Sequence, residues 1–346
     1  APADNPWGAR RAQNGHPEPY GVVWWGIGNE MYGAWQLGNV PVERYAIRHN
    51  AFVRAMRAVD PKIKTIAVGD PGKWNDVFLP ACASTTDLLS AHHYSQRKLR
   101  VPFSPDDARK YRQDYLKYSS TVADGVLRLI DDLRKRQDGK NPEIMRMRLA
   151  IDEWGLVRDW NAAPDAAGVG AFEHYYTLGD AVAVGRALHV LLRSADLVAM
   201  GNWPQMVNVI GAIKTTRNHA ALDPVGHVLA LYRSRLGGRL IPLRLAQPTT
   251  VDAVATLDHT RNILAIGLIN FSPDAQTRVR LGLKTGASAR PAALWRIHGP
   301  DLGAINIPGQ PEAVTTAKLE PPTSLDSPIL LPPHSISVFE IGHAGD

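Results

Sequence analysis

The sequence predicts an α/β protein that joins a partial (β/α)8 TIM barrel, over residues 1–236, to a C-terminal β-sandwich, over residues 237–346. Two observations predict this fold class. Up to about residue 236, short apolar runs alternate with longer helical patterns, and after it strand-like runs follow at short intervals with turn residues between them. The 346 residues are enough for two domains with a sizeable core.

The first region contains five strand candidates, at residues 22–27, 64–68, 88–91, 149–151 and 197–200. Each is a continuous apolar run rather than an alternation of apolar and polar residues. Such runs are typical of parallel strands that are covered on both faces. We therefore expect a parallel sheet with helices on both sides.

Helical patterns separate these strands. Pro41 stands where a first helical residue is expected, and apolar residues then recur at helical spacing up to Met56. Pro61 pushes Asp60 out of the helical region and ends this helix. Further helices are predicted over residues 108–136, 171–193 and 224–235, so that strands and helices alternate along the chain.

The second region has the pattern of an all-β domain. Its strand-like runs are LIPLRL, VDAVATLD, NILAIGLINFS, TRVRLGL, PAALWRI and SISVFEI. Short runs separated by turn residues predict a jelly-roll-like β-sandwich. The Pro-rich segment LEPPTSLDSPILLPPHS is expected to be a surface connection before the last strand.

The count of β/α units leaves two architectures open. Five units could form an open sheet or a barrel without its first three units, because a closed barrel needs eight. A partial barrel would expose two long strand edges and an apolar interior, which would aggregate unless something covers them. A second chain that supplies three β/α units would provide this cover.

Composition and charge argue against several kinds of partner. The net charge is +6, from 39 basic and 33 acidic residues that are dispersed along the chain, so we expect no nucleic-acid surface. Apolar runs are too short for a membrane span, and we expect no membrane partner. The single cysteine, Cys82, excludes an internal disulfide and is expected to be a packed thiol.

Polar and aromatic side chains follow the predicted strands. Catalytic residues of (β/α)8 barrels lie at the C-terminal ends of the strands, so these side chains should share one rim. Two carboxyl groups about 5 Å apart suit retaining glycoside hydrolysis, and aromatic rings such as Trp25, Trp35 and Trp203 suit a sugar. The candidate site residues are Asn29, Glu30, His92, Tyr94, Glu153, Trp154 and Gln205.

These residues also have other interpretations. Either glutamate alone could be an ordinary strand-end residue that pairs with an arginine. The Gly-x-Gly of GIGNEM is not a dinucleotide fingerprint, because Met31 stands where the third glycine is needed. His92 and His93 are adjacent, which sends their side chains to opposite faces of an extended segment. We therefore expect neither a metal site nor a cofactor.

The segments that carry these residues resemble a known family. GIGNEMYGAWQLG is similar to the acid/base segment of family 51 glycoside hydrolases, the α-L-arabinofuranosidases of clan A, and AIDEWGL is similar to their nucleophile segment. NGHPEPYGV, SAHHYS and PQMVNVIGAI resemble further segments of the same family. The likeness covers essentially the whole chain, and it implies that the five β/α units are barrel strands 4 to 8.

The resemblance implies a role for each candidate residue. Glu30 would be the general acid/base, with a raised pKa while it is protonated, and Glu153 the nucleophile of a double displacement. Asn29 would bind the sugar 2-OH, and Tyr94 would orient Glu153. His92, Trp154 and Gln205 would lie at the sugar site, and the substrate would be a terminal α-L-arabinofuranosyl residue.

The sequence also departs from the family pattern. Gly155 and Val157 replace an Asn and a Trp after the nucleophile, and Tyr32 stands where the family commonly has Asp. These changes leave open another clan A activity, such as a β-xylosidase, an endoglucanase or another furanosidase. A non-catalytic sugar-binding subunit of a split enzyme is a further alternative. The resemblance also allows a homo-oligomer.

Overall fold

The computed structural model describes residues 1–97, 101, 103–158, 173–247, 249–283 and 289–343. The chain divides into two compact units. Unit 1 comprises residues 1–90 and 136–148, and unit 2 comprises residues 91–135 and 149–346. The chain passes between them within strand β3, Leu88–Arg97, at the end of helix α5, Thr121–Arg136, and within strand β4, Arg148–Arg158. The domain boundary at residue 236 stays a prediction.

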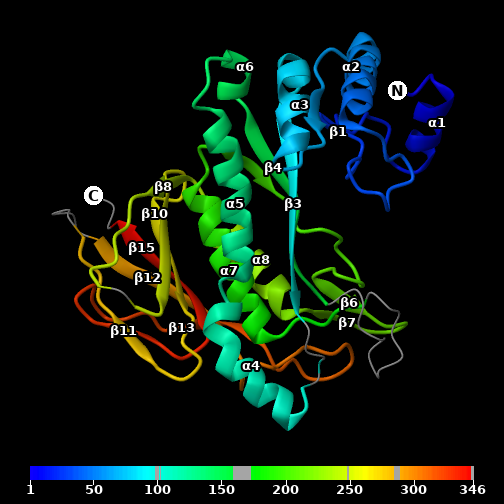
Figure 1. The fold of residues 1–346 in the computed structure, drawn as a ribbon. Coiled ribbons are helices and arrows are strands. Elements are labelled where there is room, and N and C mark those ends of the chain that lie inside the picture. Colours follow the sequence, from blue (N-terminus) through cyan, green and yellow to red (C-terminus); the bar gives the residue numbers. More distant parts are fainter. Residues whose placement is uncertain (98–100, 102, 159–172, 248, 284–288, 344–346) are drawn as a thin grey trace. The chain divides into compact units, whose positions relative to one another are not determined.

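Unit 1 contains a parallel arrangement of strands, as the sequence predicts. Strand β1, Trp24–Ile27, pairs in parallel with β2, Lys64–Ala67, and β2 pairs in parallel with the start of β3. Helices α2, Val42–Val59, and α3, Lys73–Cys82, lie side by side next to these strands (Figure 1). The remaining helices described in unit 1 are short: α1 at Pro6–Gln13, α6 at Pro142–Met145 and a 3-10 helix, η1, at Ala83–Thr85.

Helix α2 forms close to its predicted bounds. Pro41 is the N-cap in an extended conformation rather than the first helical residue, and Asp60 ends the helix with extended backbone angles. The Tyr45 hydroxyl donates to the Ile27 carbonyl at 2.8 Å and accepts from the Val68 amide at 2.8 Å. This one side chain therefore ties α2 to the ends of β1 and β2.

Helix α3 was not predicted, because Pro80 lies inside it and interrupts the helical pattern. Its apolar residues nevertheless form a buried face, with Phe78 and Leu79 fully buried. The helix ends at Cys82, whose thiol is buried and donates to the Ala46 carbonyl at 3.6 Å. The prediction of a packed thiol is confirmed.

The prediction that every strand is covered on both faces is wrong for β1. Trp24 and Trp25 are each 42% exposed, and Val22 and Val23 before them are also exposed. Among the described residues, β1 pairs with β2 on one edge and with no strand on the other. The apolar run therefore lies at an open edge of this sheet rather than inside it.

Unit 2 carries another parallel pair and four of the α-helices in the described ranges. Strand β4 pairs in parallel with β5, Val198–Gly201, with a register shift between Leu149 and Ala150. The predicted helix over residues 108–136 is two helices, α4 at Pro105–Tyr118 and α5 at Thr121–Arg136. The remaining two are α7, Leu178–Arg193, and α8, Pro224–Arg235.

Helix α7 begins later than predicted. Thr177 and Asp180 form a capping box, in which the Thr177 hydroxyl accepts from the Asp180 amide and the Asp180 carboxylate accepts from the Thr177 amide. This reciprocal pair satisfies two amides at the helix start and fixes it at Leu178. The first two residues of the predicted helix, 171 and 172, lie outside the described residues.

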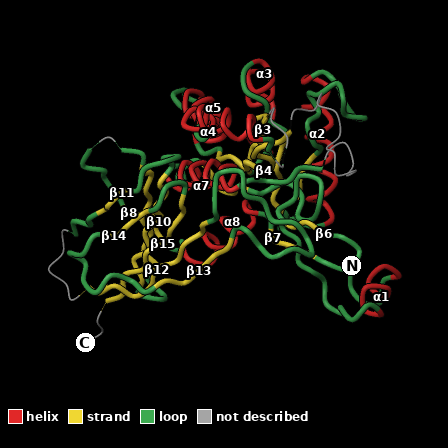
Figure 2. The backbone as a smooth tube through the Cα atoms, turned by 90° about the horizontal axis from the view of Figure 1, so that it is seen from below, coloured by secondary structure: helices red, strands yellow, loops and turns green. Residues whose placement is uncertain are grey.

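The C-terminal part of unit 2 is antiparallel. Its larger sheet has the order β13-β12-β15-β10-β9-β8, and β11 pairs with β14 in a second sheet (Figure 2). A hairpin of β6, Ile213–Thr215, and β7, Ala220–Leu222, precedes them. The strands are β8 Arg239–Ile241, β9 Val251–Asp258, β10 Ile263–Asn270, β11 Thr277–Val279, β12 Ala289–His298, β13 Thr315–Leu319, β14 Ile329–Leu331 and β15 Ser335–His343.

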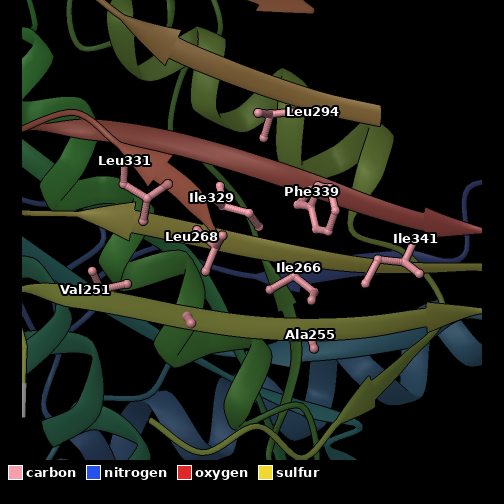
Figure 3. Close-up of a cluster of buried hydrophobic side chains, with 10 residues drawn as sticks. Val251, Ala255, Ile266, Leu268, Leu294, Ile329, Leu331, Phe339 and Ile341 are labelled. Carbon is pink, nitrogen blue, oxygen red and sulfur yellow. The ribbon is translucent and has the colours of Figure 1, made fainter. Parts of the chain in front are cut away.

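A buried apolar cluster joins the two antiparallel sheets (Figure 3). Ile266, Leu268 and Phe339 come from the larger sheet, and Ile329 and Leu331 come from β14. Strand β14 corrects a prediction, because it lies in the Pro-rich segment that was expected to be a surface connection. None of the helices in the described ranges has a stretch long and apolar enough to span a bilayer.

Candidate active site

The two candidate catalytic carboxylates lie in different units. Glu30 follows β1 in unit 1, and Glu153 lies in β4 in unit 2. Asn29, beside Glu30, is exposed. The separation of about 5 Å that retaining hydrolysis requires between the two carboxyl groups stays a prediction.

The structure brings Glu153, Tyr94 and His92 together within unit 2. The Tyr94 hydroxyl donates to Glu153 Oε2 at 2.9 Å, and His92 Nδ1 lies 3.7 Å from the same oxygen. The other ring nitrogen of His92, Nε2, lies 3.2 Å from Asp152 Oδ1. Residues 92 and 94 share one face of β3 because successive side chains of a strand point to opposite faces.

The two oxygens of Glu153 therefore differ. Every hydrogen bond and ion pair of Glu153 with the described residues involves Oε2, and the side chain is 30% exposed. The imidazole of His92 is only 6% exposed, so this neighbour of the carboxylate is almost completely buried. One carboxylate oxygen is held by neighbouring groups, and Oε1 is left available to a ligand.

Glu30 is held by donors from its own loop. Trp35 Nε1 donates to Glu30 Oε2 at 2.8 Å, and Gln36 Nε2 donates to the same oxygen at 3.3 Å. The Tyr32 hydroxyl donates to Oε1 at 3.4 Å. The backbone of Glu30 has a φ of 44°, which is uncommon for a residue with a side chain and is typical of functional sites.

Trp154 and Gln205 lie in different surroundings. Trp154 is fully buried and meets the Trp203 ring edge-on, with 5.3 Å between the ring centroids. Gln205 is exposed, with a φ of 57°. Their predicted contacts with a sugar stay predictions.

The structure shows what surrounds Gly155 and Val157, the two positions that differ from the family pattern after Glu153. Gly155 has a φ of 145°, and a Cβ built on it would lie 2.7 Å from the Trp203 ring. Val157 is fully buried. The tryptophan that the family pattern has after the nucleophile is absent, and the Trp203 ring from the segment after β5 packs directly against β4 instead.

Sequence reasoning missed the buried groups that fix this segment. The Tyr176 hydroxyl lies within hydrogen-bond distance of the Leu156 carbonyl, at 3.1 Å, and the Ile210 carbonyl, at 2.8 Å. Lys214 pairs with Glu173 at 2.9 Å, and the second oxygen of Glu173 accepts from the Val209 amide. These residues are dispersed in the sequence and carry no motif, so no local signal could have found them.

A second buried carboxyl group supports Tyr176. Both oxygens of Asp223 accept from the Tyr176 amide, at 3.2 and 3.3 Å. Burial raises the pKa of Asp223 well above its usual range, although the Lys214 cation opposes this change. The segment that carries Trp203 is thus attached to the protein interior by a network of buried polar groups.

Two family models match the chain. The model described as "Alpha-L-arabinofuranosidase C-terminal domain" matches residues 152–335, and the model described as "Alpha-L-arabinofuranosidase 1 domain" matches residues 1–121. The first covers more than half of the chain, and it includes Glu153. The second includes Glu30 and both residues of β3 that lie near Glu153.

Curated relatives of the chain are also named as arabinofuranosidases. The chain is 25% identical to a probable α-L-arabinofuranosidase C of Aspergillus flavus, over 95% of this chain and 67% of the relative. It is 27% identical to an intracellular exo-α-(1→5)-L-arabinofuranosidase of Bifidobacterium longum, over 91% of this chain and 62% of the relative. The chain thus spans about three fifths to two thirds of the length of these relatives.

Solved structures of arabinofuranosidases are also similar. The arabinose complex of the α-L-arabinofuranosidase from Thermotoga maritima superposes with a TM-score of 0.75 at 26% identity, over 97% of this chain and 70% of that one. The family 51 enzyme from Thermotoga petrophila has a TM-score of 0.72 at 27% identity, again over 97% of this chain and 70% of that one.

Proposed function

Because the chain belongs to the family 51 α-L-arabinofuranosidases, we propose that in its complete assembly it releases terminal α-L-arabinofuranosyl residues from arabinose-containing oligo- or polysaccharides. The reaction is a retaining double displacement. The observation that carries the proposal is the asymmetric environment of Glu153. Tyr94 and His92 contact Oε2 and leave Oε1 available for attack.

In the first step, Glu153 Oε1 attacks the anomeric carbon while Glu30 gives its proton to the oxygen of the leaving group. The bond from the anomeric carbon to that oxygen breaks, and an ester bond between the sugar and Glu153 forms. The leaving group departs as an alcohol. Tyr94 keeps its hydrogen bond to Oε2 and so fixes the direction in which Oε1 points.

In the second step, Glu30 is a carboxylate and removes a proton from a water molecule, which attacks the anomeric carbon. The ester bond to Glu153 breaks, and arabinose leaves with the configuration that it had in the substrate. Both carboxyl groups return to their starting protonation states, so the reaction needs no metal ion or cofactor.

Two relatives support the substrate class, because the names of these Bifidobacterium longum proteins specify exo-acting arabinofuranosidases for α-(1→5) and α-(1→6) linkages. Asn29 and Gln205, which are both exposed, are proposed to contact the sugar. The contact predicted for Trp154 would require this fully buried ring to become accessible. Another clan A activity stays the alternative, because Gly155 and Val157 replace the Asn and Trp of the family pattern and the Trp203 ring lies beside Gly155. A panel of aryl furanosides and pyranosides separates these activities.

The proposed activity belongs to a complete barrel, and the exposed residues of β1 support this. An open edge that carries Trp24 and Trp25 is suited to pairing with another strand. We propose that three further β/α units cover this edge, which completes the eight units of a barrel. A second chain as their source stays a prediction.

Replacement of the nucleophile tests the reaction. In the complete assembly, E153A should lower kcat by at least about 10⁴-fold, because no ester intermediate can form. Added azide should then restore turnover and give a glycosyl azide of inverted configuration. The control is E143A, which changes an exposed glutamate of α6 that pairs with Arg146. Activity of E153A near the wild-type level would remove Glu153 as the nucleophile.

A further inference from the structure

The loop after β1 folds back onto the carboxylate that begins it. The Gly33 amide donates to the Glu30 carbonyl at 2.7 Å, and the Gln36 amide donates to the Gly33 carbonyl at 3.0 Å. These successive turns return the side chains of Trp35 and Gln36 to Glu30. The loop thereby brings two side-chain donors to the carboxylate of its own first residue.

Trp35 is positioned by its hydrogen bond and by a glycine rather than by burial. Trp35 is 71% exposed, so apolar burial cannot fix the position of its ring. A Cβ built on Gly33 would lie 2.4 Å from the ring of Trp35, which means that the ring occupies the space that any other residue would fill. The indole N–H then reaches Glu30 Oε2 at 2.8 Å.

The side-chain donors of Tyr32, Trp35 and Gln36 stabilise the ionised form of Glu30, because a charged acceptor makes the stronger hydrogen bond. Tyr32 adds to this set at a position where the family pattern commonly has a carboxylate. The double displacement needs Glu30 protonated in its first step and ionised in its second. Donors of this kind therefore favour the second step.

We propose that Trp35 is a positioning residue for the second step, in which its indole N–H orients the Glu30 carboxylate as the base that activates water. This inference rests on the proposed function. It assigns the loop a role in the breakdown of the glycosyl-enzyme, and it makes Gly33 necessary because only glycine leaves room for the indole ring.

W35F tests the proposal, since it removes the N–H and keeps an aromatic ring. The substrate is an aryl α-L-arabinofuranoside with a good leaving group, for which kcat reports the second step and kcat/KM the first. We expect kcat to fall about tenfold and kcat/KM to change less than about twofold. Azide needs no base, so it should restore kcat and give a glycosyl azide of retained configuration.

G33A is the second variant, because its methyl group displaces the ring of Trp35. As in W35F, kcat should fall while kcat/KM changes little. The control is W7F, which changes another exposed tryptophan of unit 1 and should leave both parameters unchanged. An equal fall in kcat and kcat/KM, or no response to azide, overturns the proposal. A wild-type assembly without arabinofuranosidase activity overturns the proposed function itself, whereas an active wild type with an unaltered W35F overturns this inference alone.

Discussion

At the scale of single residues, Glu30 and Glu153 contrast in how they are held. Glu153 is fixed through one oxygen by side chains of another strand, whereas Glu30 is fixed by donors from its own loop. The positions of both glutamates at or near strand ends could be predicted from sequence, because Asn-Glu and Asp-Glu-Trp follow predicted strands, whereas their catalytic roles stay a proposal. The pairing of His92 with Asp152 could not, because it depends on the register between β3 and β4.

The hydroxyl of Tyr94 gives a prediction at this scale. Y94F removes the 2.9 Å donor to Glu153 Oε2 and should lower kcat/KM by about 10- to 100-fold, the effect expected for one hydrogen bond to a charged group. The unfolding midpoint in urea should be unchanged. Y20F changes an exposed tyrosine and serves as the control. Equal kcat/KM values for Y94F and the control would contradict the assigned role.

At the scale of elements, the apolar pattern predicted those strands and helices that have a regular periodicity, such as α8 and β9. It missed α3, where Pro80 interrupts the pattern, and β14, where prolines flank three apolar residues. Both elements form because tertiary packing buries their apolar residues, and burial by distant residues cannot be read from local sequence. The exposure of β1 was missed for a related reason, since an apolar run does not reveal what covers it.

Helix α2 provides a prediction about pH. His49 is fully buried, and burial lowers its pKa from the usual 6.5 to about 4. The unfolded chain binds a proton near pH 6.5 that the folded chain takes up only near pH 4, so the free energy of unfolding should fall by about 3 kcal/mol as the pH drops through this window.

Chemical unfolding of the wild type and H49Q between pH 7 and pH 4 tests this. The loss of stability should be smaller in H49Q by about that amount, because glutamine does not titrate. The matched control is H16Q, which changes an exposed histidine of the same unit and should retain the wild-type pH dependence. Parallel curves for H49Q and the wild type would contradict the prediction.

At the scale of the whole molecule, the alternation of apolar runs with helical patterns predicted five β/α units. This number is three fewer than the eight units of a closed barrel. The arrangement of the complete barrel depends on contacts between residues far apart in the chain. For that reason the sequence could predict the alternation of strands and helices but not how the strand edges are covered.

The assembly prediction belongs to this scale. Purified active material should contain three further β/α units besides this 37.8 kDa chain, because β1 has an open edge and exposed tryptophans. A denaturing gel and an intact mass measurement identify the components. A soluble, monomeric and active species of 37.8 kDa would contradict the prediction.

The environment of Cys82 has a practical consequence. Burial raises the pKa of this thiol to about 11, and the sequence contains no other cysteine. A thiol reagent at neutral pH should therefore react only when α3 separates from α2. The labelling rate would measure how often this part of unit 1 opens, at one site and without engineering a probe into the protein.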